Sequence, residues 1–297
     1  MLKFLASAAV ALMISTAANA ASFEEFWPEI WAQLPDDLRA DVGAMDFKQG
    51  EILLKDGIAA VSIPDTYYYL TPADSQIMLE KMWGNPKGMP PLGIIMPRDL
   101  TPIHPDAWAA ILDFDPVGYV EDKDAASTDF NAVLEQSKAD AIAQSEERVK
   151  LGMDPVYLMG WAEAPHYDGE SRTLYWAKDL VFGTNELHSL NYNARILGRK
   201  GVLQMNFVAG MDQLAEVKQK APEVMQMATF TRGHSYLDFD PSVDKVAAYG
   251  IGGLIAAKVA AKVGFLGVAL LFLKKFFFLL FIPLVWLKNK IFRRPEA

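Results

Sequence analysis

The 297-residue sequence contains no cysteine and only four histidines. Without cysteine, the chain has no disulfide, no thiolate zinc site, no iron–sulfur cluster and no cysteine nucleophile. The histidines are His104, His166, His188 and His234, and none has the H-x-H, H-x-x-H or H-E-x-x-H spacing of a preformed metal site. Gly-rich phosphate loops and a G-x-S-x-G elbow are also missing. The sequence therefore predicts no metal, no cofactor and no catalytic residue.

Basic side chains are outnumbered in the body of the chain, and acidic side chains are nearly missing from its C-terminal region. Residues 21–249 carry 19 basic against 36 acidic side chains, whereas residues 250–297 carry eight basic side chains and one acid, Glu296. A body this acidic repels the phosphates of nucleic acid and of anionic lipid, so we expect no nucleic-acid partner. The pattern leaves open a well-solvated soluble domain or a body that meets a basic partner.

The N-terminus has the pattern of a secretory signal peptide. Lys3 precedes a mostly apolar run from Phe4 to Ile14, and small and polar residues follow up to Ala20. The run is too short to span a bilayer, and the A-x-A pattern at residues 18–20 places cleavage after Ala20. We therefore expect residues 21–245 to form an exported domain on the periplasmic side of a bacterial inner membrane.

The C-terminal region has the composition of a membrane anchor. Residues 263–287 contain 18 Val, Leu, Ile or Phe in 25 positions, which is enough to cross about 30 Å of hydrocarbon. Lys274 and Lys275 lie near the middle of this segment, where each ammonium is costly. They predict either contact with another membrane protein or a displaced helix.

The residues on either side of this span suggest its orientation and its connection to the body. The basic tail, residues 288–297, predicts a cytoplasmic C-terminus by the positive-inside rule. Residues 246–262 are interpreted either as a membrane-proximal helix or as the upper part of one long transmembrane helix.

The exported body alternates strand-like and helix-like patterns. Helices are predicted at residues 23–34, 71–83, 127–151 and 211–227, and strands at 51–55, 58–63, 92–96, 109–114, 117–120, 156–163, 172–181, 187–197 and 202–209. Strand pairs joined by short turns predict an α+β fold, with a mainly antiparallel sheet and helices packed on it. Asp122, Asp124 and Asp129 are interpreted as an acidic turn leading into a helix capped by Ser127 or Thr128. The Glu and Gly of a calcium loop are absent there.

Several sequence strings carry a family resemblance. They include Trp83-Gly84-Asn85-Pro86, Gly160-Trp161-Ala162, Leu190-Asn191-Tyr192, Leu197-Gly198-Arg199 and residues 244–250, DKVAAYG. In this order, over about residues 40–285, the chain resembles a bacterial family of membrane-anchored proteins classified only as a domain of unknown function. The resemblance implies a periplasmic domain on an inner-membrane anchor and implies no activity.

One set of polar and aromatic residues is the candidate binding site of the body. The set consists of Trp161, His166, Tyr167, Asp168, Trp176, Asn191 and Arg195. Residues 166–168 are expected in a turn between two strands. Asn191 and Arg195, four apart on the next strand, should share one face. The alternative is that the two tryptophans pack across strands and that Arg195 forms an ordinary ion pair with Asp168 or another acid.

Two functions of different classes fit these observations. The first is a non-enzymatic binding or accessory module of the cell envelope, tethered to the inner membrane. The second is a periplasmic hydrolase that uses Asp168 or Glu163 with His166 for acid–base chemistry. An enclosed cleft that brings His166 and a carboxylate within hydrogen-bond reach would favour the hydrolase, whereas a flat or filled sheet face would favour binding.

Overall fold

The computed structural model describes residues 19–256, apart from residues 86, 151 and 185. Four predicted features lie wholly or partly outside the described residues: residues 1–18 of the predicted signal peptide, residues 257–262 of the predicted membrane-proximal segment, the predicted span 263–287 with Lys274 and Lys275, and the basic tail. Within the described residues, no helix is both long and apolar enough to cross a bilayer.

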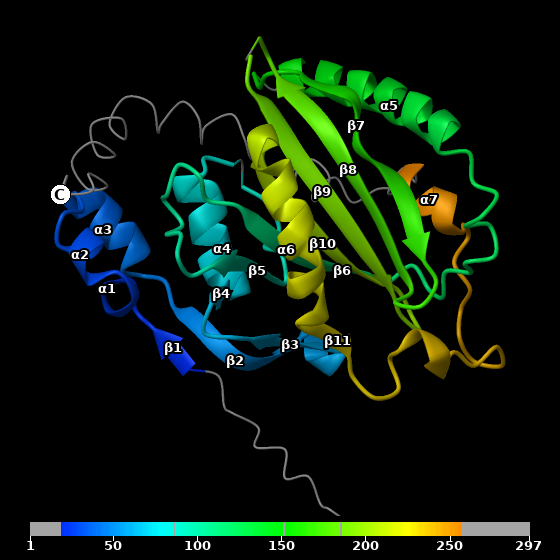
Figure 1. The fold of residues 1–297 in the computed structure, drawn as a ribbon, viewed down its shortest axis with the longest axis horizontal. Coiled ribbons are helices and arrows are strands. Elements are labelled where there is room, and N and C mark those ends of the chain that lie inside the picture. The colour runs from blue at the N-terminus through cyan, green and yellow to red at the C-terminus, as the bar shows by residue number, and fades with distance from the viewer. Residues whose placement is uncertain (1–18, 86, 151, 185, 257–297) are drawn as a thin grey trace, which may run out of the picture.

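The described part is built on one strongly twisted sheet of eleven strands with helices packed against it (Figure 1). The strand order is β11-β3-β2-β4-β5-β6-β10-β9-β8-β7, with β1 added beside β2, and every ladder is antiparallel. The predicted α+β class with a mainly antiparallel sheet is confirmed.

The bounds of the elements follow the predicted ones closely in the second half of the body. The strands are β1 Asn19–Ala21, β2 Phe47–Leu54, β3 Ala59–Ile63, β4 Tyr67–Leu70, β5 Gly93–Pro97, β6 Ala109–Asp115, β7 Val156–Asp168, β8 Thr173–Phe182, β9 His188–Leu197, β10 Val202–Gly210 and β11 Ala228–Phe230. The helices are α1 Phe23–Phe26, α2 Pro28–Trp31, α3 Asp36–Val42, α4 Pro72–Ile77, α5 Phe130–Lys150, α6 Leu214–Gln226 and α7 Ile251–Ala256. Short turns η1 Lys55–Gly57, η2 Met78–Met82, η3 Met211–Gln213 and η4 Tyr236–Asp238 complete the described part.

One face of the sheet, here called the α6 face, is apolar across its centre. Neighbouring strands place Tyr69, Ile95, Ala110, Phe207 and Tyr192 side by side in one row. The helix α6 adds Val217, Ala221 and Met225 to this cluster, and Leu214 packs against it. This face is held by apolar burial.

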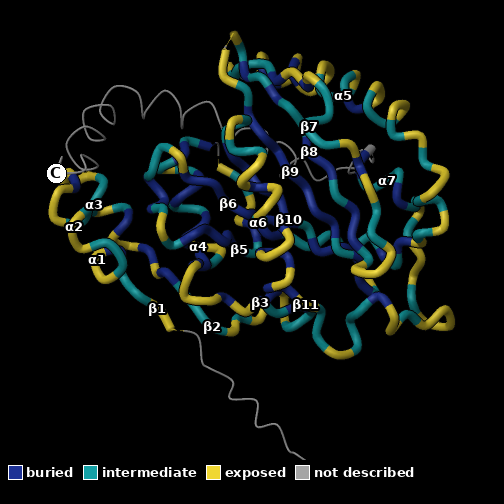
Figure 2. The backbone as a smooth tube through the Cα atoms, in the orientation of Figure 1, coloured by how far each residue is buried: buried dark blue, intermediate teal, exposed yellow. Residues whose placement is uncertain are grey.

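The opposite face, here called the α5 face, is divided. One apolar cluster gathers Phe47, Tyr68 and Ile94 with the residues of α1–α4. A second cluster gathers Trp176, Leu197 and Val202 with α7, and α5 contacts both clusters. Across the register, Ile111 of the first cluster is followed by Asn206, Asn193 and then Trp176 of the second. Polar side chains therefore separate the two apolar clusters, and they are buried. The strands β9 and β10 are mostly buried along their length (Figure 2).

The predicted helix at residues 23–34 is broken into α1 and α2. Trp27 has φ −137° and ψ 65°, and Pro28 is the first residue of α2. Proline disfavours the helical conformation in the residue before it, so the aromatic periodicity alone gave a helix that was too long.

The predicted strand at residues 117–120 is wrong. Gly118 has φ +99°, outside the range of a strand, and a Cβ there would lie 2.6 Å from the Lys245 carbonyl oxygen. Tyr119 instead forms an isolated parallel bridge with Val246. The strand-like residues at this position therefore lie where the chain passes beside the segment that contains Val246, which is distant in sequence.

The helix predicted at residues 71–83 stops near Gly84 as predicted, where φ is +67°, but it changes at Met78 into a π-helical turn. Two other element ends differ from the prediction. The helix α5 is capped by Asp129, whose Oδ1 accepts the backbone N–H groups of Asn131 and Ala132, and not by Ser127 or Thr128. The strand β7 runs five residues beyond its predicted end at residue 163.

Candidate functional site

The most unusual feature of the sheet is a group of polar side chains buried on the α5 face. This group, the polar cluster, consists of Trp176 and Lys178 on β8, Asn191, Asn193 and Arg195 on β9, and Asn206 on β10. The side chains lie at alternate positions of neighbouring strands, so they project from the same side of the sheet. Asn191, Asn193 and Arg195 have only 6%, 4% and 6% of their surface exposed.

Arg195 organises the polar cluster. Its Nη1 donates to the Oδ1 of Asn206 at 3.0 Å, and its Nη2 donates to the Oδ1 of Asn193 at 3.2 Å. A guanidinium has donors only, so it fixes which end of each amide faces it. The guanidinium carbon also lies 4.9 Å from the centre of the Trp176 ring, which adds a cation–π contact.

The hydrogen bonds continue along β9. The Nδ2 of Asn193 donates to the side-chain oxygen and to the backbone oxygen of Asn191, both at 2.9 Å. The Nδ2 of Asn191 and the indole Nε1 of Trp176 are buried, and neither has an acceptor among the described residues. The hydrogen-bond chain that starts at Arg195 therefore ends at the Nδ2 of Asn191, a donor without an acceptor among the described residues.

Burial shifts the pKa values of the charged groups in and beside the polar cluster. Burial lowers the pKa of Lys178 to about 8, and the nearby charge of Arg195 lowers it further. Burial also lowers the pKa of Arg195 to about 10, against the opposite influence of Asp115 and Asp113. Burial raises the pKa of Asp113 to about 6. Desolvated charges with displaced pKa values concentrate at functional sites.

Three residues of the predicted site, Trp176, Asn191 and Arg195, meet in the polar cluster. Asn191 and Arg195 share one face as predicted, but Arg195 pairs with asparagine oxygens and not with Asp168. Trp161 lies on the same face, where its ring packs in the second apolar cluster and its Nε1 donates to the Phe130 carbonyl at 3.4 Å.

The remaining predicted residues lie elsewhere. Tyr167 is on β7 and donates from its hydroxyl to Asp122 at 2.8 Å, and Asp122 also pairs with Arg172. Asp168 ends β7 and accepts hydrogen bonds from Ser171 and from the Glu170 backbone, so its role is to shape the hairpin. Residues 166 and 167 belong to the strand, contrary to the predicted turn.

His166 lies on the α6 face, away from the polar cluster. Its ring stacks on Tyr175 with the centres 4.8 Å apart, and its side chain is 54% exposed. Its Nδ1 is 3.8 Å from the Oε1 of Glu163, and that oxygen is 3.1 Å from the Nζ of Lys218. Glu163 is thus paired with a lysine, and His166 is a half-exposed stacked ring.

The acidic residues after β6 have separate structural roles. Asp124 accepts the backbone N–H groups of Ile251 and Gly252, which holds the start of α7. Asp122 binds Tyr167, and Asp129 caps α5. In the described ranges, no three His, Asp or Glu residues are placed to hold a metal ion.

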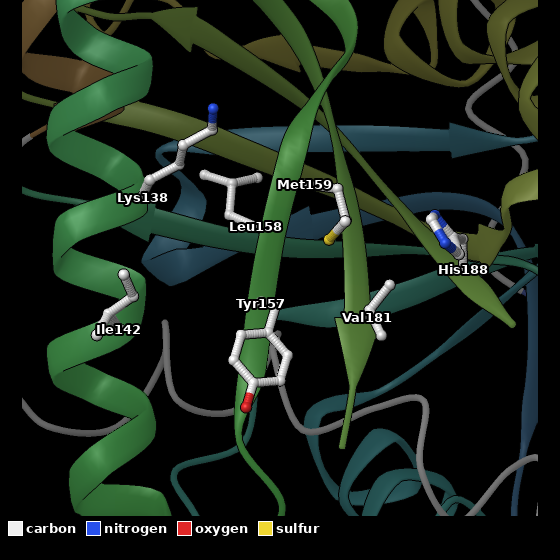
Figure 3. A pocket seen from close by; sticks show the side chains of 7 residues that line it. All are labelled: Lys138, Ile142, Tyr157, Leu158, Met159, Val181 and His188. Carbon is white, nitrogen blue, oxygen red and sulfur yellow. The ribbon is translucent and has the colours of Figure 1, made fainter. Parts of the chain in front are cut away.

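A shallow groove of about 560 Å³ lies at the open edge of the sheet (Figure 3). It is lined by Lys138 and Ile142 of α5, Tyr157, Leu158 and Met159 of β7, Val181 of β8 and His188 of β9. Ile142, Tyr157 and Met159 are exposed apolar side chains, and β7 is the last strand in the sheet order. His188 is held by Asp179, with 2.7 Å between Nδ1 and Oδ1.

Sequence reasoning missed Lys178, Asn193 and Asn206 as members of the polar cluster. A signal for two of them was present, because Asn191, Asn193 and Arg195 alternate along β9, and Trp176 and Lys178 alternate along β8. Asn206 alternates with Gln204 among the apolar residues of β10, which is a weaker signal of the same kind.

The described chain is thus an antiparallel α+β protein with a buried polar cluster and an apolar groove at the sheet edge. The chain belongs to the protein family of unknown function DUF2167, whose family model matches residues 46–285. No curated protein matches the sequence.

One solved structure shows a weak similarity to the chain. It is the solution structure of cyanobacterial PsbP (CyanoP) from Synechocystis sp. PCC 6803, with 9% identity and a TM-score of 0.36. The alignment covers 61% of this chain and 91% of that one. At this level the similarity carries no argument about function.

Arg195→Met tests whether the polar cluster is one network. The substitution leaves the amide oxygens of Asn193 and Asn206 buried without their donor, so we expect a loss of about 3 kcal/mol or more in the free energy of unfolding. Arg232→Met, at an exposed arginine, should change it by no more than about 0.5 kcal/mol. Chemical denaturation of both variants gives the two values. Equal stability of the Arg195 variant and the parent would show that the guanidinium does not hold the cluster.

Proposed function

We propose that the chain is a non-enzymatic binding module of the bacterial cell envelope, with its body in the periplasm and its C-terminal segment in the inner membrane. The signal-peptide pattern, the apolar run at residues 263–287 and the basic residues after it support this topology. The single observation that carries the binding role is the apolar groove at the open edge of the sheet.

The occupant that fits the groove is an extended segment of a partner polypeptide. An edge strand offers unpaired backbone groups, and neighbouring pockets take alternate side chains of an added strand. The strand β7 has this position in the sheet, and Tyr157 and Met159 are 45% and 53% exposed beside it. The backbone N–H and C=O of Val156 at the start of β7 are paired with the Ser145 hydroxyl of α5, so an added strand would pair beyond Val156, where Tyr157, Leu158 and Met159 line the groove.

The hydrolase alternative has less support. A general acid–base pair needs a carboxylate within hydrogen-bond reach of the histidine. His166 is half-exposed and 3.8 Å from Glu163, and that carboxylate is paired with Lys218. The stacking of His166 on Tyr175 fits a packing role at the edge of α6.

Lys274 and Lys275 form the second part of this proposal, as contacts to another membrane protein. The sequence has no acidic residue between Lys245 and Glu296, so the chain offers these lysines no carboxylate of its own inside the apolar segment. An acidic or carbonyl partner on a neighbouring membrane helix would offset the cost of placing them there.

A photo-crosslinking side chain at Met159 of the full-length protein in its own membrane tests the groove. We expect it to capture one polypeptide that the same side chain at Leu53 does not capture, because Leu53, an even more exposed apolar residue, lies on the distant strand β2. The captured polypeptide, produced separately, should bind the purified chain at least tenfold more weakly after Tyr157→Lys than after Leu53→Lys. Equal capture at both positions, or equal binding by both variants, would contradict the groove as the binding surface.

The lysine pair is tested by the double variant Lys274→Leu with Lys275→Leu. If this variant loses co-purification of a membrane protein while capture at Met159 survives, the lysine pair is a separate contact.

The topology can be tested with reporter fusions. A reporter that is active only in the cytoplasm should be active after Ala297 and silent after Gly210, because the basic tail is retained on the cytoplasmic side. Activity measured in whole cells for the two fusions gives the orientation. The reverse pattern would overturn the periplasmic placement of the body and leave the groove experiment unaffected.

A further inference from the structure

The geometry points to a second, separate binding site, in which Lys178, Asn191 and Trp176 of the polar cluster hold the carboxylate of a small organic acid. This site lies on the α5 face of β8 and β9, whereas the groove of the proposed function lies at the β7 edge. The two sites have different residues and different ligand chemistry.

The unmet donor on Asn191 is fixed in place by the rest of the network. Arg195 can only donate, so Asn193 must turn its oxygen toward Arg195 and its nitrogen toward Asn191. Asn191 must then turn its oxygen toward Asn193. Flipping the Asn191 amide would place two N–H₂ groups against each other. Its Nδ2 is therefore presented to whatever lies on the side away from Asn193.

Two further donors flank this nitrogen. Lys178 is the direct register partner of Asn191, and Trp176 is the register partner of Asn193. Side chains directly opposite in an antiparallel pair have Cβ atoms about 5 Å apart, so the groups can reach one ligand. No hydrogen bond or ion pair of Lys178 occurs among the described residues. The Trp176 Nε1 is likewise without an acceptor in that part of the chain.

Three donors with no acceptor fit a ligand that only accepts. Buried polar groups are nearly always paired, and an unpaired one costs about 1–3 kcal/mol. A carboxylate brings two oxygens that accept several hydrogen bonds and a single negative charge to match Lys178. A phosphate dianion would bring a second negative charge, whereas this group of side chains offers one cation that is unpaired among the described residues, Lys178. A metal cation needs acceptors, and the free groups here are donors.

No carboxylate of the described residues neutralises Lys178 directly, so the site can accept one added negative charge. Arg195 is on β9 beside it, Asp140 faces it from α5, and Asp113 and Asp115 on β6 act on Arg195. None of these acids lies within 4 Å of either cation among the described residues. Tyr249, before α7, has a pKa raised to about 12 by burial and stays neutral. Lys178 itself is partly exposed, so a small ligand can reach it from solvent.

Thermal unfolding of the full-length protein in mild detergent, with added sodium acetate, propionate or succinate, tests this site. At pH 7 we expect at least one of these carboxylates to raise the Tm along a saturating one-site curve, since a ligand that binds only the folded chain stabilises it. Sodium chloride at equal ionic strength serves as the reference. Lys178→Met should reduce the shift at least fivefold, and Lys220→Met, at a lysine on α6, should keep it. The shift should weaken at pH 9.5, because Lys178 loses its charge near pH 8.

The remaining outcomes would each overturn the inference. No saturable shift with any of the three carboxylates would mean that the cluster holds water only. A full shift in Lys178→Met would place the ligand elsewhere, and a larger shift with sodium phosphate would replace the carboxylate assignment. If the Lys178 variant does not fold, Asn191→Leu provides the same comparison. Loss of the groove interaction would not change any of these results.

Discussion

The buried guanidinium of Arg195 sets the arrangement of the α5 face. It lies on a sheet whose other face is filled by apolar side chains, and burial lowers its pKa. A buried charge without hydrogen bonds would be too costly, so its donors must be met. Two asparagine oxygens on β9 and β10 meet them, and a third asparagine is oriented in turn. An apolar residue at position 195 alone would not remove the requirement, because the oxygens of Asn193 and Asn206 would then be buried without a donor.

The fold was largely predictable because the strands of the second half are long and bounded by clear turns. Residues 187–210 read correctly as two strands around the Gly198–Gly201 turn, and the structure pairs Leu197 with Val202 there. The errors came from backbone constraints that hydrophobic patterns do not report. Pro28 divides a helix, and Gly118 with φ +99° breaks an apparent strand.

The candidate site was predictable only in part, for a different reason. Simple alternation along a strand assigns faces correctly only while the register is regular. On β9 it is regular, and Asn191 and Arg195 were placed together correctly. On β7 the register shifts three times, so Trp161 faces α5 while Glu163, two residues later, faces α6. Simple alternation from Trp161 does place His166 on the opposite face, but it places Glu163 on the face of Trp161 and so separates it wrongly from His166.

The two candidate sites use the same pair of elements in different ways. The helix α5 packs on the two apolar clusters that flank the polar cluster, and it contributes Lys138 and Ile142 to the groove. Its neighbour β7 forms the sheet edge.

The central claim is that the polar cluster is charged and desolvated in the folded chain, and the pKa of Lys178 tests it most directly. A pH titration of the lysine side-chain resonances by NMR, with the Lys178 signal assigned by its absence in Lys178→Met, measures this value. In the chain without added ligand, the account predicts a pKa of about 8. A value near the usual 10.4 for lysine would show that water or an acidic group solvates the ammonium, and would contradict the account.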